Sequence, residues 1–141
     1  MTFAVRSAGY SSKSNTQRLG IKPGLRIFVA GAPAAYETIV GKLPDGTSLV
    51  KRLGTAIDMV HLFATERASL VDRLSALRDA IEPGGTIWIS WPKQASGVPT
   101  DLSDNVVRGT ALPLGLVDIK ACAVDATWSG LKFVIRRELR P

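Results

Sequence analysis

Residues 57–91 read IDMVHLFATERASLVDRLSALRDAIEPGGTIWISW, and this stretch decides the fold. Ile57 to Ala64 is apolar except at Asp58 and His61, as expected of a central strand in a parallel sheet. Glu66 to Ile81 predicts a helix with one buried stripe, because its apolar positions follow three-and-four spacing. Those positions are Leu70, Leu74, Leu77 and Ile81. Pro83-Gly84-Gly85 ends this helix, and Thr86 to Trp91 forms the next apolar strand.

The flanking sequence repeats this alternation of strand and helix. Before residue 57 the pattern predicts a strand at Arg26 to Ala30, a helix at Ala34 to Lys42 that starts at Pro33, and a strand at Ser48 to Lys51. After residue 91 it predicts a helix at Asp101 to Leu112 with Thr100 or Asp101 as its N-cap. Two final strands, Leu116 to Val124 and Leu131 to Leu139, are expected to pair as an antiparallel hairpin.

This order predicts an α/β fold of the Rossmann-like type, a three-layer sandwich around a mostly parallel sheet with a C-terminal antiparallel hairpin. A chain of 141 residues is expected to form one domain over 1–141. Residues 1–20 are polar, and we expect them to be a partly ordered N-terminal extension with a short helix between Ser11 and Leu19.

The chain has 18 lysines and arginines against 12 acids, a net charge of +6. The basic residues are scattered along the sequence, which favours a solvated basic surface over a nucleic-acid site. The partners expected are therefore an anionic small molecule or an acidic protein surface. A single cysteine and no apolar run of membrane-spanning length indicate a soluble, cytoplasmic protein.

Three short motifs resemble the S-adenosylmethionine-dependent methyltransferases. IKPG followed by RIFVAG (21–24, 26–31) is similar to their first, nucleotide-binding strand. GTAIDMVHLF (54–63) is similar to a strand that opens with an acid, here Asp58, and IEPGGTIWIS (81–90) to a later strand after its turn. The resemblance implies a methyltransferase-like architecture over most of residues 20–138.

Four blocks resemble an uncharacterised family of short bacterial proteins, common in actinobacteria. They are Gly9-Tyr10-Ser11, LGIKPG (19–24), WPKQASGVPTDL (91–102) and AVDATWSGLKFVIRRELR (123–140). This resemblance implies the same methyltransferase-like fold and supplies no substrate or reaction.

The loop after the first strand departs from the methyltransferase pattern. Such loops place several glycines against the cofactor, because only a residue without Cβ lets the backbone approach closely. Here VAGAPAAYE (29–37) offers one glycine, Gly31, and the second strand ends in basic Lys51-Arg52 where methyltransferases carry an acid for the ribose. Both departures disfavour S-adenosylmethionine, so no cofactor is expected.

Two segments are candidate ligand sites. The first is the start of the helix after Pro33, where free N–H groups suit a phosphate-bearing or acidic ligand. Its residues are Gly31, Ala32, Ala34, Lys51 and Arg52. The alternative is an ordinary helix start beside a solvated basic pair. The second is the loop at the carboxyl end of the strand that stops at Trp91, and ligands bind at such strand ends in open α/β sheets. Its residues are Trp91, Lys93, Ser96, Thr100 and Asp101. The alternative is that this loop only shapes a turn.

The remaining residues with reactive side chains favour structural roles. His61 has no second histidine for a metal site and is expected to be a hydrogen-bonded core residue. Cys122 lies in an apolar strand and is expected to be a small buried side chain. No catalytic residue is assigned.

The favoured function is a non-catalytic module that binds a small anionic or nucleotide-like ligand, or a protein, on a degenerate methyltransferase-like scaffold. The alternative is an S-adenosylmethionine-dependent methyltransferase with an atypical cofactor loop.

Overall fold

The computed structural model describes residues 15–140, which form one six-stranded sheet in the order β2-β1-β3-β4-β6-β5. The strands are β1 (Arg26–Ala30), β2 (Ser48–Leu49), β3 (Ile57–Phe63), β4 (Ile81–Pro92), β5 (Leu116–Ala123) and β6 (Trp128–Ile135). The helices are α1 (Asn15–Arg18), α2 (Tyr36–Val40), α3 (Arg67–Ala80) and α4 (Asp104–Ala111), with short 3-10 helices at Gln94–Ser96, Leu112–Leu114 and Arg137–Leu139.

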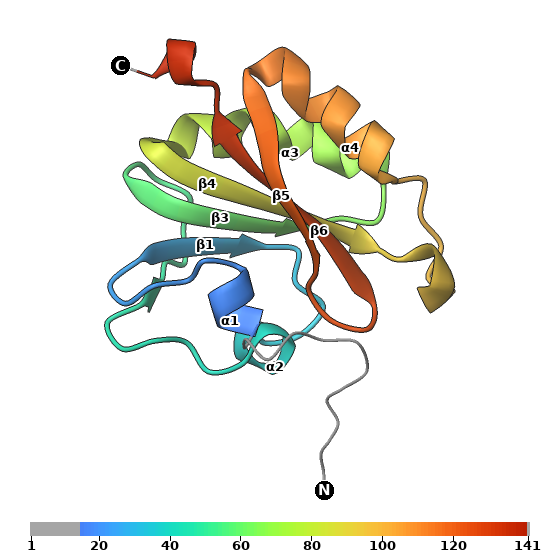
Figure 1. Cartoon of the computed structure of the whole chain (residues 1–141), viewed down its shortest axis with the longest axis horizontal. Coiled ribbons are helices and arrows are strands. Elements are labelled where there is room, and N and C mark those ends of the chain that lie inside the picture. The colour runs from blue at the N-terminus through green and yellow to red at the C-terminus, as the bar shows by residue number, and fades with distance from the viewer. Residues whose placement is uncertain (1–14, 141) are drawn as a thin grey trace, which may run out of the picture.

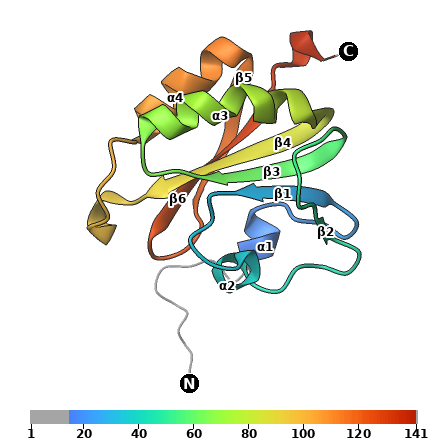
Figure 2. The ribbon, with the colours of Figure 1, turned by 180° about the vertical axis from the view of Figure 1, so that it is seen from behind.

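Strands β1 to β4 run parallel, and β6 pairs antiparallel with both β4 and β5. Helices α3 and α4 cover one face of the sheet, and α1 and α2 cover the other (Figures 1 and 2). The predicted three-layer α/β architecture with a C-terminal antiparallel hairpin is therefore confirmed.

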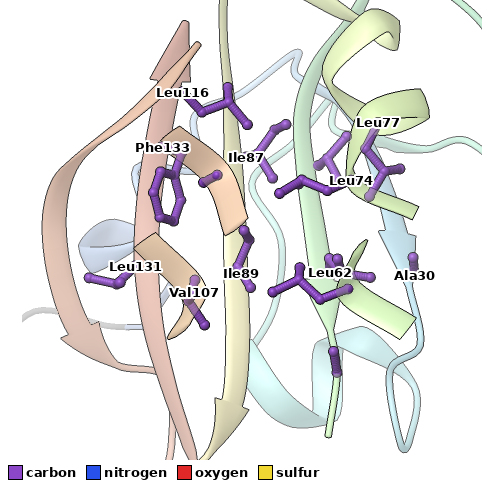
Figure 3. Close-up of a cluster of buried hydrophobic side chains, with 14 of the residues drawn as sticks. Ala30, Leu62, Leu74, Leu77, Ile87, Ile89, Val107, Leu116, Leu131 and Phe133 are labelled. Atoms are coloured by element: carbon purple, nitrogen blue, oxygen red, sulfur yellow. The ribbon is translucent and has the colours of Figure 1, made fainter. Parts of the chain in front are cut away.

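The core under α3 and α4 is built by the alternation of side chains along each strand (Figure 3). Leu74 and Leu77 of α3 and Val107 of α4 are fully buried against the sheet. The strands contribute Leu62, Ile87, Ile89, Leu131 and Phe133. Burying each such side chain contributes about 1.5–3 kcal/mol, so this layer anchors the fold.

The core under α1 and α2 is more aromatic. Ile27 of β1, Met59 of β3 and Trp88 of β4 are buried there with Leu19 and Ile39 from the helical layer. The indole Nε1 of Trp88 donates to the carbonyl oxygen of Leu19 over 2.9 Å. This hydrogen bond fixes the segment after α1 to the middle of the sheet.

The structure corrects two predicted helix starts. Helix α2 begins at Tyr36, not at Ala34, because Ala35 has the non-helical ψ of 135° and its carbonyl oxygen accepts from Thr38. Helix α4 begins at Asp104 with Ser103 as N-cap, whose hydroxyl accepts from the Val106 amide. The predicted caps, Thr100 and Asp101, make other hydrogen bonds instead.

The final strand begins earlier than predicted, at Trp128 instead of Leu131. The carboxylate of Asp125 accepts from the amides of Thr127 and Trp128, both over 2.8 Å, and this closes the hairpin turn within residues 124–127.

The predicted N-terminal helix falls partly outside the described residues, which retain Asn15–Arg18 of it as α1. The block Gly9-Tyr10-Ser11 also lies outside them. Within residues 15–140, no helix is long and apolar enough to cross a bilayer.

Candidate functional site

A cavity of about 610 Å³ opens where β4 ends, beside the β5–β6 hairpin and the start of α4. Figure 1 shows this region, where the segment after β4 runs past the sheet to α4. The lining comes from four parts of the chain: Trp91–Gln94, then Thr100 with Leu102–Asp104 and Arg108, then Ala121–Ala123, and finally Ser129–Leu131.

Backbone and hydroxyl hydrogen bonds fix the loop that frames this cavity. The Lys93 amide donates to the Thr127 carbonyl oxygen over 2.7 Å, which holds the loop to the hairpin turn. The Ser96 hydroxyl donates to the Lys93 carbonyl oxygen over 2.7 Å and accepts from the Val98 amide. Ser96 is therefore occupied in closing the turn and does not line the cavity.

Thr100 and Asp101 connect the loop to the start of α3. The Thr100 hydroxyl donates to the Thr65 carbonyl oxygen over 2.6 Å and accepts from the Leu102 amide. The Asp101 carboxylate accepts from the Arg67 amide over 2.7 Å, which satisfies an orphan donor of the first turn of α3. Thr100 lines the cavity and Asp101 does not.

The cavity is lined by two cations and one acid. Arg108 pairs with Asp118 (Nε to Oδ2, 3.0 Å) and more distantly with Asp104 (3.5 Å). The hydrogen bond to Asp118 is the main cause that raises the pKa of Arg108, so this guanidinium keeps its charge. Lys93 forms no ion pair with any carboxylate in residues 15–140. The cavity thus combines a free ammonium group with an apolar wall that includes Trp91, which also packs in the core under α3 and α4.

The thiol of Cys122 belongs to a residue that lines the cavity and is half-buried. Burial raises its pKa, and the charges of Arg18, Lys120 and Lys132 oppose this only partly. The thiol is therefore protonated at neutral pH. The sequence predicts a buried side chain here, and the structure shows one that is only half-buried.

The other predicted ligand segment lies elsewhere, and only Gly31 and Ala32 in it pack closely against neighbouring residues. Gly31 has a φ of +73°, and a Cβ there would overlap the carbonyl oxygen of Phe63 at the end of β3. Ala32 packs against the core under α2, and Ala34 is exposed in the connection before α2. The sequence predicts free helical N–H groups at Ala34, Ala35 and Tyr36. Since α2 has only five residues and starts at Tyr36, Ala34 and Ala35 lie before the helix and the predicted cluster does not form.

Lys51 and Arg52 follow β2 at the edge of the sheet and are exposed. Strands β1 and β3 separate β2 from β4, so this basic pair is not part of the cavity at Trp91. Asp58, the acid that opens β3, accepts from the Arg26 amide over 2.8 Å at the opposite, amino end of these parallel strands.

His61 is fully buried between two hydroxyl groups, as predicted for a core histidine. Its Nδ1 lies 2.6 Å from the Tyr36 hydroxyl and its Nε2 lies 2.7 Å from the Ser90 hydroxyl. Burial lowers the pKa of His61 to about 3 and raises the pKa of Tyr36, so both side chains are neutral at physiological pH. The His61 ring also stacks on Phe63 at 4.3 Å, which in turn contacts Trp128 edge-on.

Sequence reasoning missed Arg108, Asp104 and Ser103 as cavity residues. The i, i+4 spacing of Asp104 and Arg108 is visible in the sequence as a helical ion pair. The distance that matters, however, joins Arg108 to Asp118 on β5, and no local pattern predicts that contact.

Comparison with known proteins supports the fold and no more. No protein-family model matches the sequence, and no curated protein matches it. Among solved structures, a SAM dependent methyltransferase from Aquifex aeolicus is similar over 85% of this chain and 87% of its own, with a TM-score of 0.62 and 14% identity. The magnesium protoporphyrin IX methyltransferase of Synechocystis PCC 6803 with bound SAH is similar over 84% and 78%, with a TM-score of 0.57 and 12% identity.

The fibrillarin pre-rRNA processing protein of Methanococcus jannaschii is similar over 82% of this chain and 68% of its own, with a TM-score of 0.60 and 10% identity. At these identities the likeness establishes a methyltransferase-like Rossmann fold, and the same architecture hosts many functions.

Proposed function

We propose that this protein is a non-catalytic binding module for a small anionic, nucleotide-like ligand, built on a methyltransferase-like scaffold. The observation that carries the proposal is the position of the cavity. It lies at the end of β4 and is lined by both Trp91 and Lys93, while Gly31 in the turn after β1 is packed on Phe63. A planar group would lie against the apolar wall, and a negative group would pair with the Lys93 ammonium.

The chemistry of the lining supports binding without catalysis. The Thr100 and Ser103 hydroxyls are occupied in local hydrogen bonds, and Arg108 is paired with acids. The Cys122 thiol is protonated, and His61 lies buried with both ring nitrogens bonded to hydroxyl groups. In the described part of the chain, none of these lining residues forms the hydrogen-bonded pair of nucleophile and base that covalent catalysis uses.

The test is calorimetric titration of the protein with adenosine 5′-monophosphate, which carries a planar base and a dianion. We expect binding, and we expect Lys93→Met to weaken it about tenfold, since a charge-assisted hydrogen bond contributes about 1.5 kcal/mol or more. Lys51→Met is the matched control, because it removes an exposed lysine at the other candidate segment. Loss of binding in Lys51→Met with retention in Lys93→Met would place the ligand after β1 and contradict the proposal. Absence of binding in the unmodified protein would also contradict it.

The alternative is an S-adenosylmethionine-dependent methyltransferase, and the similarity to the Aquifex and Synechocystis enzymes favours it. In that case the residues that would hold the cofactor are those of the β1 turn, Gly31 to Ala34, and the cofactor would supply the methyl group. Gly31 carries no side chain that could block the cofactor, so the fit depends on the space above Ala32 and Pro33. Micromolar binding of S-adenosylhomocysteine in the same calorimeter would select this alternative.

Three finer properties belong to the same proposal. We infer a cytoplasmic protein from its single cysteine, and membership of the short actinobacterial family from the four sequence blocks. An acidic protein surface is the second class of partner that the basic balance of the chain suits, and nucleic acid stays disfavoured.

A further inference from the structure

Two lysines face each other across the terminal hairpin. Lys120 of β5 and Lys132 of β6 are direct partners in the antiparallel ladder. Direct partners project to the same face of a sheet with Cβ atoms about 5 Å apart, and like charges there are destabilising. Such a pairing is unfavourable unless another group compensates it.

Both ammonium groups reach the end of α1 or the residues just after it. Lys120 Nζ donates to the Arg18 carbonyl oxygen over 2.5 Å, and a Cβ placed on Gly20 would lie 3.0 Å from Lys132 Nζ. The residues just after α1 are held there by the hydrogen bond from Trp88 to Leu19. The two ammonium groups therefore lie on the same face of the sheet as α1. Figure 1 shows α1 on that face.

Lys22 lies two residues after Gly20, the glycine beside Lys132 Nζ, and is the third lysine of the group. Burial is the main cause that lowers the pKa of Lys132, and the charges of Lys120 and Lys22 lower it further. Lys22 and Lys120 are exposed and Lys132 is half-buried, so an ion from solvent can reach the cluster.

No carboxylate in residues 15–140 forms an ion pair with Lys22, Lys120 or Lys132. Residues 1–14 add Arg6 and Lys13 and contain no aspartate or glutamate. The Arg18 carbonyl oxygen accepts a hydrogen bond but carries no net charge. Within residues 15–140, no carboxylate therefore compensates these three cations, and an anion from solvent can do so.

We propose that Lys22, Lys120 and Lys132 form a binding site for the phosphate group of a small molecule, separate from the cavity at Trp91. A phosphate dianion carries two charges and several acceptor oxygens, so it can bind three ammonium donors at once. None of the three lysines lines the cavity, so this site goes beyond the proposed function and does not depend on it.

The test is thermal unfolding of the whole chain with inorganic pyrophosphate, compared with sodium chloride at the same ionic strength. We expect millimolar pyrophosphate to raise Tm by several degrees more than sodium chloride does, because an anion that binds only the folded state stabilises it. Lys132→Met should abolish this extra shift. Lys42→Met removes an exposed lysine outside the cluster and should keep it.

The unliganded Lys132→Met protein gives a second readout. Its Tm at low salt should equal or exceed that of the unmodified protein, since the substitution removes a half-buried cation opposite Lys120. An unchanged pyrophosphate shift in Lys132→Met, or a shift matched by sodium chloride, would overturn the proposal.

A single-stranded oligonucleotide distinguishes the source of the phosphate. One outcome is that the oligonucleotide binds in a way that needs Lys132 and weakens steeply with salt, while pyrophosphate has no effect. That result would overturn the small-molecule site and indicate a nucleic-acid backbone. We expect pyrophosphate to bind at least as tightly as the oligonucleotide does when affinities are compared per binding site.

Discussion

At the scale of single residues, His61 is placed where protonation is most costly. A neutral imidazole has one donor and one acceptor nitrogen, so the Tyr36 and Ser90 hydroxyls can satisfy both. The ring is fully buried, and its pKa of about 3 lies far below the usual 6.5. Between those two pH values, the unfolded chain takes up a proton at this position while the folded protein keeps the histidine neutral.

This difference predicts a pH dependence of stability. Below about pH 6.5 the unfolded chain binds a proton at His61 that the folded protein does not bind until about pH 3. The free energy of unfolding should consequently fall as pH falls from 6.5 to 5, with a slope of up to about 1.4 kcal/mol per pH unit. Urea denaturation at half-unit pH steps measures this slope.

His61 is the only histidine in the sequence, which makes the slope assignable. His61→Gln removes the titrating group and should flatten the profile between pH 5 and 6.5. Ser90→Ala keeps the imidazole buried and should lower stability at every pH while retaining the slope. An equal slope in His61→Gln would show that another group causes it.

At the scale of elements, the sequence predicts best where one local pattern suffices. The predicted bounds of α3 agree with the observed ones within one residue at each end, because the spacing of Leu70, Leu74 and Leu77 specifies a single buried face. The predicted start of α2 is two residues early. Pro33 suits a first helical turn, but Gly31 packs against the end of β3 and the chain stays non-helical up to Ala35.

The candidate site is predictable to the same extent. Trp91 lies at the end of β4, and Lys93 and Thr100 lie in the loop that follows. Sequence proximity brings them together, and all three line the cavity. Arg108 reaches the cavity from α4 through a contact with β5, and only the fold determines that distance. The cluster of Lys22, Lys120 and Lys132 could not be predicted from the sequence for the same reason, because its residues are scattered along the chain.

The connection after β1 gives a prediction at this scale. Gly31→Ala should destabilise the protein in two ways, because an alanine at φ +73° is strained by about 1–2 kcal/mol and its Cβ overlaps the Phe63 carbonyl oxygen. The overlap adds roughly 1–3 kcal/mol, the usual cost of overpacking. Chemical denaturation of the two proteins measures the sum.

Gly24→Ala is the matched control for that experiment. Gly24 has a φ of +84°, and a Cβ added there would meet nothing within 4 Å, so its substitution carries the backbone strain alone. We expect Gly31→Ala to be the more destabilising of the two. Equal losses in both variants would mean that the β1 connection can move away from β3 at no cost.

At the scale of the whole molecule, the two hydrophobic layers share one sheet. Strand β6 serves both, since Leu131 and Phe133 belong to the core under α3 and α4 while Trp128 belongs to the core under α1 and α2. Strand β4 divides its side chains likewise, with Trp91 in the first layer and Trp88 in the second. If the strands separate from one layer, the buried side chains of the other layer are exposed as well.

The shared sheet predicts that both layers unfold in one transition, which also tests the expectation of a single domain. The double variant Trp88→Phe with Trp128→Phe leaves Trp91 to report on the layer under α3 and α4 by fluorescence. Trp88→Phe with Trp91→Phe leaves Trp128 to report on the other layer. Within each variant, the fluorescence midpoint in urea should coincide with the midpoint from far-ultraviolet circular dichroism, as two-state unfolding requires. If the Trp128 signal is lost at lower urea than the circular dichroism signal, the layer that contains α1 and the lysine cluster unfolds on its own. In that case, a ligand bound to the cluster would stabilise only that layer.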